Sequence, residues 1–207
     1  MAYGISSGNY FEYTRNYNVS TFTASIWAYA TSTTGSPAIC GLWSIAGTTG
    51  SDQWFISLNS SARLLCAIVD TGDNYRVPEE ATGSFPTNTW THVALVKTTS
   101  NLIVYKNGTQ VASVSAPSAM KSRTTATGLG SRTGGGSPWP GYIAEFATWT
   151  RALSADEIAS LADGFKPSRF PTPDIYYPLV RDQIDVRNKY TLTATGSPTV
   201  QPHPRVY

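Results

Sequence analysis

Acidic side chains are the first candidates for chemistry in this sequence. Hydrolysis of a glycosidic bond uses two carboxyl groups, one as acid and the other as nucleophile or base. A strand supplies such a pair when acids alternate, because residues two apart lie on one face. No such alternation occurs: Glu145 stands alone in its apolar run, and the neighbours Glu79 and Glu80 point apart if extended. We therefore expect no catalytic residues and no enzyme activity.

The two histidines do not complete a catalytic set. His92 lies in the run Trp90-Thr-His-Val-Ala-Leu-Val, where we expect a hydrogen-bonded strand histidine. His203 stands between two prolines near the C-terminus, an unsuitable place for a rigid general base. A phosphate-binding loop is also missing, since the glycines at 134–136 precede Ser-Pro rather than Lys and a helix.

Metal ligands are sparse. Asp70, Asp73 and Asn74 lie in one predicted loop and could supply oxygens to calcium, although three such acceptors more often simply form a turn. Cys40 and Cys66 each sit in an apolar run, which predicts reduced thiols in the core; a disulfide between neighbouring strands is the alternative. We expect no metal site and no cofactor.

Loop aromatics are the candidates for ligand binding. Tyr75, Trp139 and Tyr142 lie in or beside predicted loops, where they could stack on a sugar. For Trp139, between two prolines, the alternative is a loop anchor packed on the domain. The remaining tryptophans are expected to face or flank the core, and they are Trp27, Trp43, Trp54, Trp90 and Trp149.

Strand-like segments fill most of the chain. They are residues 10–14, 22–30, 39–46, 53–58, 63–69, 90–97, 102–106, 110–114 and 127–131. Asn107-Gly108 predicts a two-residue type I′ hairpin, with Lys106 facing Thr109 and Val104 facing Val111.

A strand from Gly141 and a single short helix close this part of the chain. Ser154 and Glu157 have the spacing of a capping box. Ile158 and Leu161 give the helix an apolar stripe, and Gly164 can end it.

Three motifs together resemble the laminin-G-like, concanavalin A-like domain family. They are Phe22-Thr-x-Ser-x-Trp, then Trp90-x-His-Val-Ala-Leu-Val with Leu102-x-Val-Tyr-x-Asn-Gly, and the closing Arg151-x-Leu-Ser-x-x-Glu-Ile. The resemblance covers about residues 8–164, and it departs from the family at Ala144, where Asp is usual. It implies an all-β fold, a two-sheet antiparallel jelly-roll sandwich over residues 1–164. Residues 165–207 would then be a Pro-rich C-terminal arm.

The tail carries isolated aromatics among prolines: Phe170, Tyr176, Tyr177 and Tyr207. Such a segment suits an extended arm that docks on a partner, or one that packs back on its own domain. Its sequence also resembles tails of laminin-G-like proteins of phages.

These features predict a non-catalytic phage structural protein that decorates the capsid or another virion surface, as a homo-oligomer with a trimer favoured. Residues 1–7 show no signal peptide and no apolar run is long enough to span a membrane, so we expect synthesis in the host cytoplasm and a place in the virion. The net charge of +2 argues against nucleic acid and membrane partners. The alternative is a carbohydrate-binding module or receptor-binding adhesin that recognises glycans.

Overall fold

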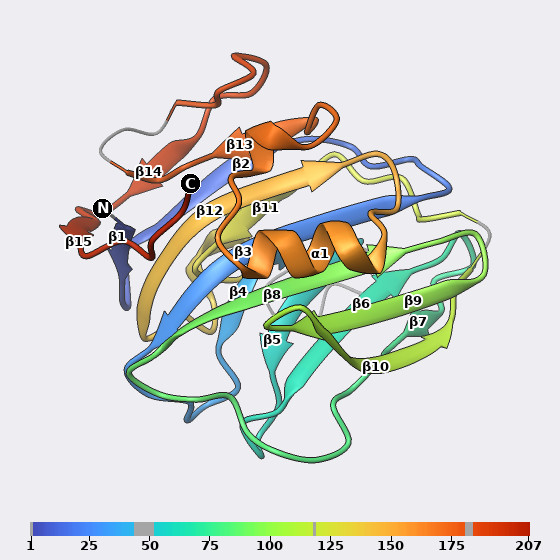
Figure 1. The fold of residues 1–207 in the computed structure, drawn as a ribbon, viewed down its shortest axis with the longest axis horizontal. Helices are drawn as coiled ribbons and strands as arrows, with labels where there is room; N and C mark the ends of the chain where they lie inside the picture. Colours follow the sequence, from blue (N-terminus) through green and yellow to red (C-terminus); the bar gives the residue numbers. More distant parts are fainter. Residues whose placement is uncertain (1, 44–51, 118, 181–183) are drawn as a thin grey trace.

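The computed structural model describes residues 2–43, 52–117, 119–180 and 184–207. Its strands form two antiparallel sheets that pack into a sandwich, which confirms the predicted jelly roll (Figure 1). The first sheet contains, in spatial order, β10 (Thr109–Ser115), β9 (Asn101–Lys106), β8 (Trp90–Lys97), β3 (Phe22–Ala30), β12 (Gly141–Trp149), β1 (Ala2–Ile5) and β15 (Thr199–Gln201), and β13 (Ile175–Tyr177) also pairs with β12. The second contains β14 (Thr193–Thr195), β2 (Tyr10–Thr14), β11 (Ala126–Leu129), β4 (Ala38–Leu42), β5 (Trp54–Leu58), β6 (Leu64–Val69) and β7 (Tyr75–Arg76).

Helical structure in the described part of the chain is limited to α1 (Ala155–Ala162) and two 3-10 turns, Thr133–Gly135 and Pro167–Arg169. None of these described helices is long and apolar enough to cross a membrane.

The core lies between the sheets. Alternate residues of β3 point inward and are fully buried, and these are Phe22, Ala24, Ile26 and Ala28. Trp54 of the second sheet stacks on Phe146 of the first, with ring planes 4° apart and centroids separated by 6.5 Å. Large aromatic side chains thus join the two layers at the centre of the sandwich.

Both cysteines are buried free thiols, as the apolar runs predicted. Cys40 and Cys66 lie on either side of Ile56, the cross-strand partner of each, so β5 separates their two strands. Burial raises the pKa of both thiols, because the charged thiolate loses its hydration.

The helix and its cap are also confirmed. Ser154 Oγ accepts a hydrogen bond from the Glu157 amide at 3.2 Å, and Glu157 Oε2 accepts one from the Ser154 amide at 2.8 Å. Ile158 and Leu161 are buried and belong to one cluster with residues of β8 and β12. The helix therefore covers one end of the outer side of the first sheet (Figure 1).

Two local predictions need correction. Asn107 and Gly108 both have positive φ, as a type I′ turn requires, and Lys106 faces Thr109. However, Val104 faces Ala112 rather than Val111, because a β-bulge inserts one extra residue into β10. The strand predicted over 39–46 is β4, which ends at Leu42; residues 44–46 lie outside the described residues.

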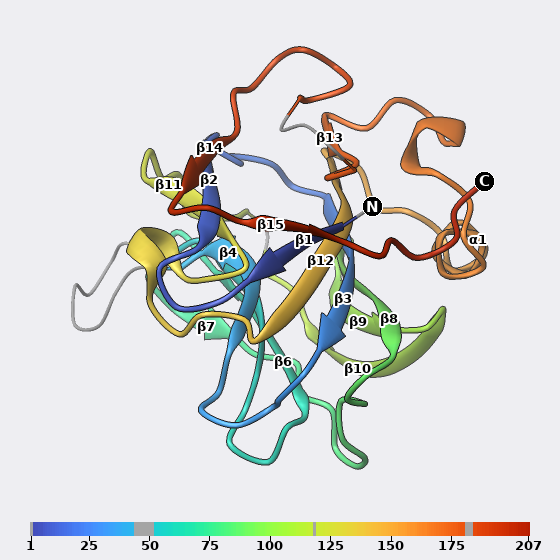
Figure 2. The ribbon, with the colours of Figure 1, turned by 90° about the vertical axis from the view of Figure 1, so that its left-hand side faces the viewer.

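The tail packs back on the sandwich and does not extend as a free arm. β13 pairs with β12, β14 with β2, and β15 with β1, so residues after Gly164 add strands to both sheets. Figure 2 shows β14 and β15 alongside β2 and β1. Strands of only three residues carry too little alternation to be recognised in a sequence, which is why these were missed.

Candidate functional site

Three aromatic rings form a continuous row on the outer side of the first sheet. Tyr142 of β12 is the cross-strand partner of Tyr29 of β3, and Tyr29 is the partner of Trp90 of β8. The Tyr29 and Tyr142 rings stack with centroids 5.0 Å apart, and the Tyr29 and Trp90 centroids are 5.7 Å apart. All three side chains are half-buried, so each ring is fixed by its neighbours and still reaches solvent. We call these three residues the aromatic row.

Trp27 and Trp90 flank the core rather than face it, which is one of the two placements that the sequence predicted. Both are half-buried on the outer side, and Trp27 packs beside His92 with ring centroids 5.4 Å apart. The sequence did contain the signal: Trp27 and Tyr29 have the opposite parity to the buried residues of β3. Trp54 and Trp149 are buried as expected, and Trp43 is half-buried.

A cavity of about 340 Å³ lies beside the Tyr142 end of the aromatic row. Its polar lining includes Ser6, Ser7 and Thr31. Ser6 Oγ accepts a hydrogen bond from Asn9, and Thr31 Oγ1 donates to the Pro140 carbonyl. An aromatic wall and hydroxyl groups that can still exchange hydrogen bonds therefore lie next to each other.

Trp139, which lies between two prolines, does not have the exposed ring expected of a residue that stacks on a sugar. Its side chain is fully buried, packs edge-on against Phe85 with centroids 5.4 Å apart, and donates from Nε1 to the Tyr29 carbonyl at 3.2 Å. Its burial in the core favours the anchor alternative, while its contact with a sugar stays a prediction. The flanking prolines fix the loop so that the indole points inward.

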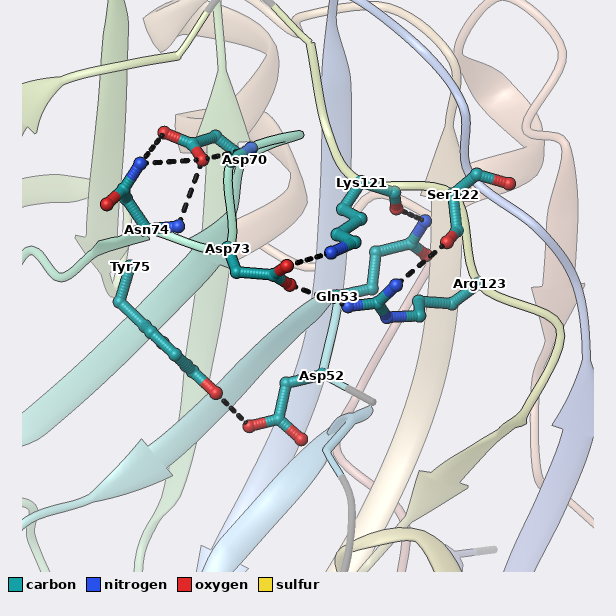
Figure 3. A network of polar contacts seen from close by, with 10 residues as sticks. Asp52, Gln53, Asp70, Asp73, Asn74, Tyr75, Lys121, Ser122 and Arg123 are labelled. Atoms are coloured by element: carbon teal, nitrogen blue, oxygen red, sulfur yellow. Dashed lines mark hydrogen bonds and ion pairs between the residues drawn. The ribbon is translucent and has the colours of Figure 1, made fainter. Parts of the chain in front are cut away.

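Tyr75 lies on a different edge, at the rim of the second sheet. Figure 3 shows its hydroxyl donating to Asp52 Oδ2, at 2.5 Å. Its side chain is 47% exposed, and burial together with the Asp52 carboxylate raises its pKa to about 12. Tyr75 lies on β7, the end strand of the second sheet, whereas Tyr142 lies on β12 of the first sheet. The two residues therefore do not form one site.

Both carboxylates of the acidic turn beside Tyr75 have partners within the protein. Asp70 Oδ1 accepts from the backbone amides of Asn74 and Gly72, which holds the pKa of Asp70 below its usual value. Asp73 pairs with Lys121 and Arg123, and the Lys121 hydrogen bond lowers its pKa (Figure 3). Among the described residues, no group of three His, Cys, Asp or Glu side chains is placed to hold a metal ion.

His92 is a hydrogen-bonded strand histidine, as expected. It is fully buried, with Nε2 2.8 Å from Ser25 Oγ. Burial lowers its pKa to about 3, so the ring stays neutral and is poorly suited to transfer protons near neutral pH.

The four aromatics predicted as partner anchors differ in how deeply they are buried. Tyr176 and Tyr177 are buried, 3% and 0% exposed, so they cannot contact a partner without unfolding of the tail. Phe170 is half-buried against the cluster under α1, and Tyr207 is 62% exposed. The expected anchor role is thereby corrected for Tyr176 and Tyr177.

The structure brings together three side chains that sequence analysis kept apart. Glu145 is almost fully buried; its Oε2 accepts from the Tyr176 hydroxyl at 2.5 Å, and its Oε1 lies 2.9 Å from His203 Nε2. All three line a second cavity, of about 570 Å³. The sequence carried no local signal for this cluster, because β12 and two separate points of the tail supply its members.

The sequence of the sandwich decides the family. A family model of the concanavalin A-like lectin/glucanases superfamily matches residues 6–159. The chain belongs to this superfamily. The match confirms the predicted resemblance, and it ends before the tail strands, which the model does not include.

Solved structures share the fold of this superfamily member at low sequence identity. A proposed carbohydrate-binding protein from Bacteroides ovatus matches 99% of the chain with a TM-score of 0.73 and 16% identity; the chain spans 61% of that protein. A heptameric SAP-like pentraxin from Limulus polyphemus has a TM-score of 0.56 at 16% identity, over 75% of this chain and 76% of that one. Domain 4 of a GH43 extracellular arabinanase from Geobacillus stearothermophilus, in complex with arabinotriose, has a TM-score of 0.54 at 19% identity, over 71% and 69%. No curated protein matches the chain in sequence.

Membership in a superfamily that includes glucanases raises the question of paired acids again. Glu145 is the only carboxylate among the described residues that line its cavity. Those described lining residues therefore do not supply the second carboxylate that a glycosidase uses.

Proposed function

We propose that this chain is a non-catalytic carbohydrate-binding domain that holds a glycan on the outer side of the first sheet. The observation that carries the proposal is the aromatic row, Tyr142, Tyr29 and Trp90, next to a hydroxyl-lined cavity. This is the alternative function that the loop aromatics suggested, at a site where Tyr142 belongs to the row and the buried Trp139 lines the adjoining cavity.

The chemistry of the aromatic row suits a sugar. A sugar ring carries C–H groups on one face, and packing that face on aromatic rings removes apolar area from water. Neighbouring rings hold each side chain in place, so little rotamer freedom is lost on binding. The hydroxyl groups of Ser6, Ser7 and Thr31 can exchange hydrogen bonds with sugar hydroxyls, which fixes orientation.

The relatives support the same class of ligand. The superfamily is named for lectins as well as glucanases, and the arabinanase domain is in complex with arabinotriose. Fold alone is shared with these structures, so the proposal for this chain depends on its own aromatic row.

Isothermal titration with arabinotriose, cellotriose and xylotriose tests the proposal. We expect at least one neutral oligosaccharide to bind, and Trp90→Ala or Tyr142→Ala to weaken binding by about tenfold or more. Tyr75→Ala is the matched control, since it removes an exposed tyrosine from the other sheet. Binding that depends on Tyr75 and is indifferent to Trp90 and Tyr142 would refute the site.

The predicted role as a capsid decoration protein of a phage virion, favoured as a trimer, stays a prediction. The described contacts lie within one chain and do not bear on it. Burial of Tyr176 and Tyr177 leaves Tyr207 as the exposed anchor of the tail.

A further inference from the structure

We propose a second ligand site, distinct from the aromatic row, that binds an acidic sugar unit such as a uronic acid. It is the cavity of about 570 Å³ lined by Glu145, Tyr176, His203, Lys166, Arg205 and Val186, among others. Its volume is within the range of small-molecule sites, about 300–1,000 Å³. The inference rests on the proposed function only for the class of ligand, because its residues and its cavity are separate.

The backbone at Glu145 is the first sign that this position is specialised. Its φ of +53° is in the left-handed region, which is unfavourable for a residue with a Cβ. A bulge between Ala144 and Ala147 produces this geometry. At the same place the outer partner of β12 changes from β1 to β13. β12 therefore has its bulge at the point where its neighbour changes from β1 to the tail strand β13. Glu145 places a carboxylate at this point.

That carboxylate retains hydrogen-bonding capacity inside the cavity. Oε2 is used by Tyr176, whose pKa is raised by burial and by the Glu145 charge, so the phenol keeps its proton and donates. Oε1 lies at ion-pair distance from His203 Nε2 but receives no directed hydrogen bond. A buried carboxylate oxygen with free lone pairs is costly unless a donor reaches it. Oε1 has almost no accessible surface because the His203 ring lies over it, so the hydroxyl group of a bound sugar becomes such a donor once that ring turns aside.

Among the described residues that line the cavity, two cations, Lys166 and Arg205, accompany one carboxylate, that of Glu145. Lys166 and Arg205 line it and are exposed, while His203 sits deeper, with Nδ1 2.6 Å from the Pro204 carbonyl. A neutral or cationic ligand would leave this positive excess unmatched. A ligand that offers hydroxyl donors to Glu145 and a carboxylate to Arg205 or Lys166 satisfies both sets, because guanidinium and ammonium groups pair well with carboxylates.

The test compares acidic and neutral sugars that differ in one group. The full-length chain is titrated with methyl β-D-glucuronoside and methyl α-D-galacturonoside, each beside its neutral glucoside or galactoside, by saturation-transfer NMR and calorimetry. We expect an acidic sugar to bind at least about tenfold more tightly than its neutral match. Arg205→Ala and Glu145→Gln should each weaken it by about tenfold or more. Arg187→Ala, which removes an exposed cation outside the cavity lining, should leave it unchanged.

The outcomes separate this inference from the proposed function. Equal affinity for acidic and neutral sugars, or no binding of either acid, overturns the inference while the aromatic row can still bind neutral oligosaccharides. Loss of the acidic sugar on Tyr142→Ala but not on Arg205→Ala places it on the row and also overturns the second site. If Glu145→Gln fails to fold, Arg205→Ala and Lys166→Ala decide, since both side chains are exposed.

Discussion

The two ends of the outer side of the first sheet carry similar residues but differ in how deeply these residues are buried. At one end Trp149 of β12 points outward and is 1% exposed, because α1 and the start of the tail cover it. At the other end Trp90 of β8 also points outward and is only half-buried, with Tyr29 and Tyr142 beside it. The side-chain types do not distinguish the two ends. What distinguishes them is whether the chain returns to cover the sheet.

The covered end therefore contributes to stability and the open end is free for binding. The described residues around Trp149 form a second small core, with Ile158 and Leu161 of the helix packed on it. Rings in the aromatic row are only half-buried, so removing one costs less apolar burial than removing the fully covered Trp149. Buried aromatics beneath the helix and half-buried aromatics at the other end of the sheet are thus expected to respond differently to the same mutation.

The largest expected effect comes from removing the tail, which shares with α1 the covering of the Trp149 end and also adds strands to both sheets. A chain that ends at Gly164 loses β13–β15 and, among the described residues, five buried hydrophobic side chains, which are Ile175, Tyr176, Tyr177, Leu179 and Leu192. Burying each such side chain contributes about 1.5–3 kcal/mol, and the sum approaches the whole stability of an ordinary domain, about 5–15 kcal/mol. We expect no cooperative denaturant unfolding and a lost near-UV circular dichroism signal. A truncated chain with an unchanged midpoint would show that the tail is an appendage.

A matched pair of tryptophan substitutions gives the next largest effect. Trp149→Ala should lower the free energy of unfolding by about 3–5 kcal/mol, since it leaves a void under α1 and removes the Nε1 hydrogen bond to the Pro171 carbonyl. Trp90→Ala should cost about 1 kcal/mol or less, the size of a cross-strand pair contribution. Urea unfolding followed by far-UV circular dichroism measures both. Equal losses would mean that the open end is as much a part of the core as the covered end.

Local sequence signals predicted the parts of this fold that depend on local physics. The hairpin at Asn107-Gly108 and the cap at Ser154 follow from residue types within a few positions, and both were predicted. The outward direction of Trp27 was available from parity, but the prediction left open whether this side chain faces the core or flanks it. The cluster of Glu145 with His203 depends on the path of the tail and on a bulge, neither of which has a local signature.

The smallest expected effect on stability comes from a mutation at the N-terminus of α1, the helix that lies over the covered end of the sheet. The hydrogen bond from Arg151 and that from the Ser154 amide hold the pKa of Glu157 below its usual value. A carboxylate with a lowered folded-state pKa stabilises the fold above its unfolded pKa, about 4.3, and loses this contribution as the pH falls through the folded pKa.

Glu157→Gln should therefore cost about 0.5–1 kcal/mol at pH 7, a modest value because the side chain is partly exposed, 24%. The difference from the wild type should shrink toward pH 3. Asp156→Asn is the matched control, because it removes a neighbouring acid of the first turn that forms no ion pair with any described residue. Urea unfolding between pH 3 and pH 7 measures both differences. The loss of unfolding free energy in Glu157→Gln could instead be the same at every pH. The charge of the carboxylate would then not stabilise α1 on the sheet, and apolar packing alone would account for the contrast with the open end.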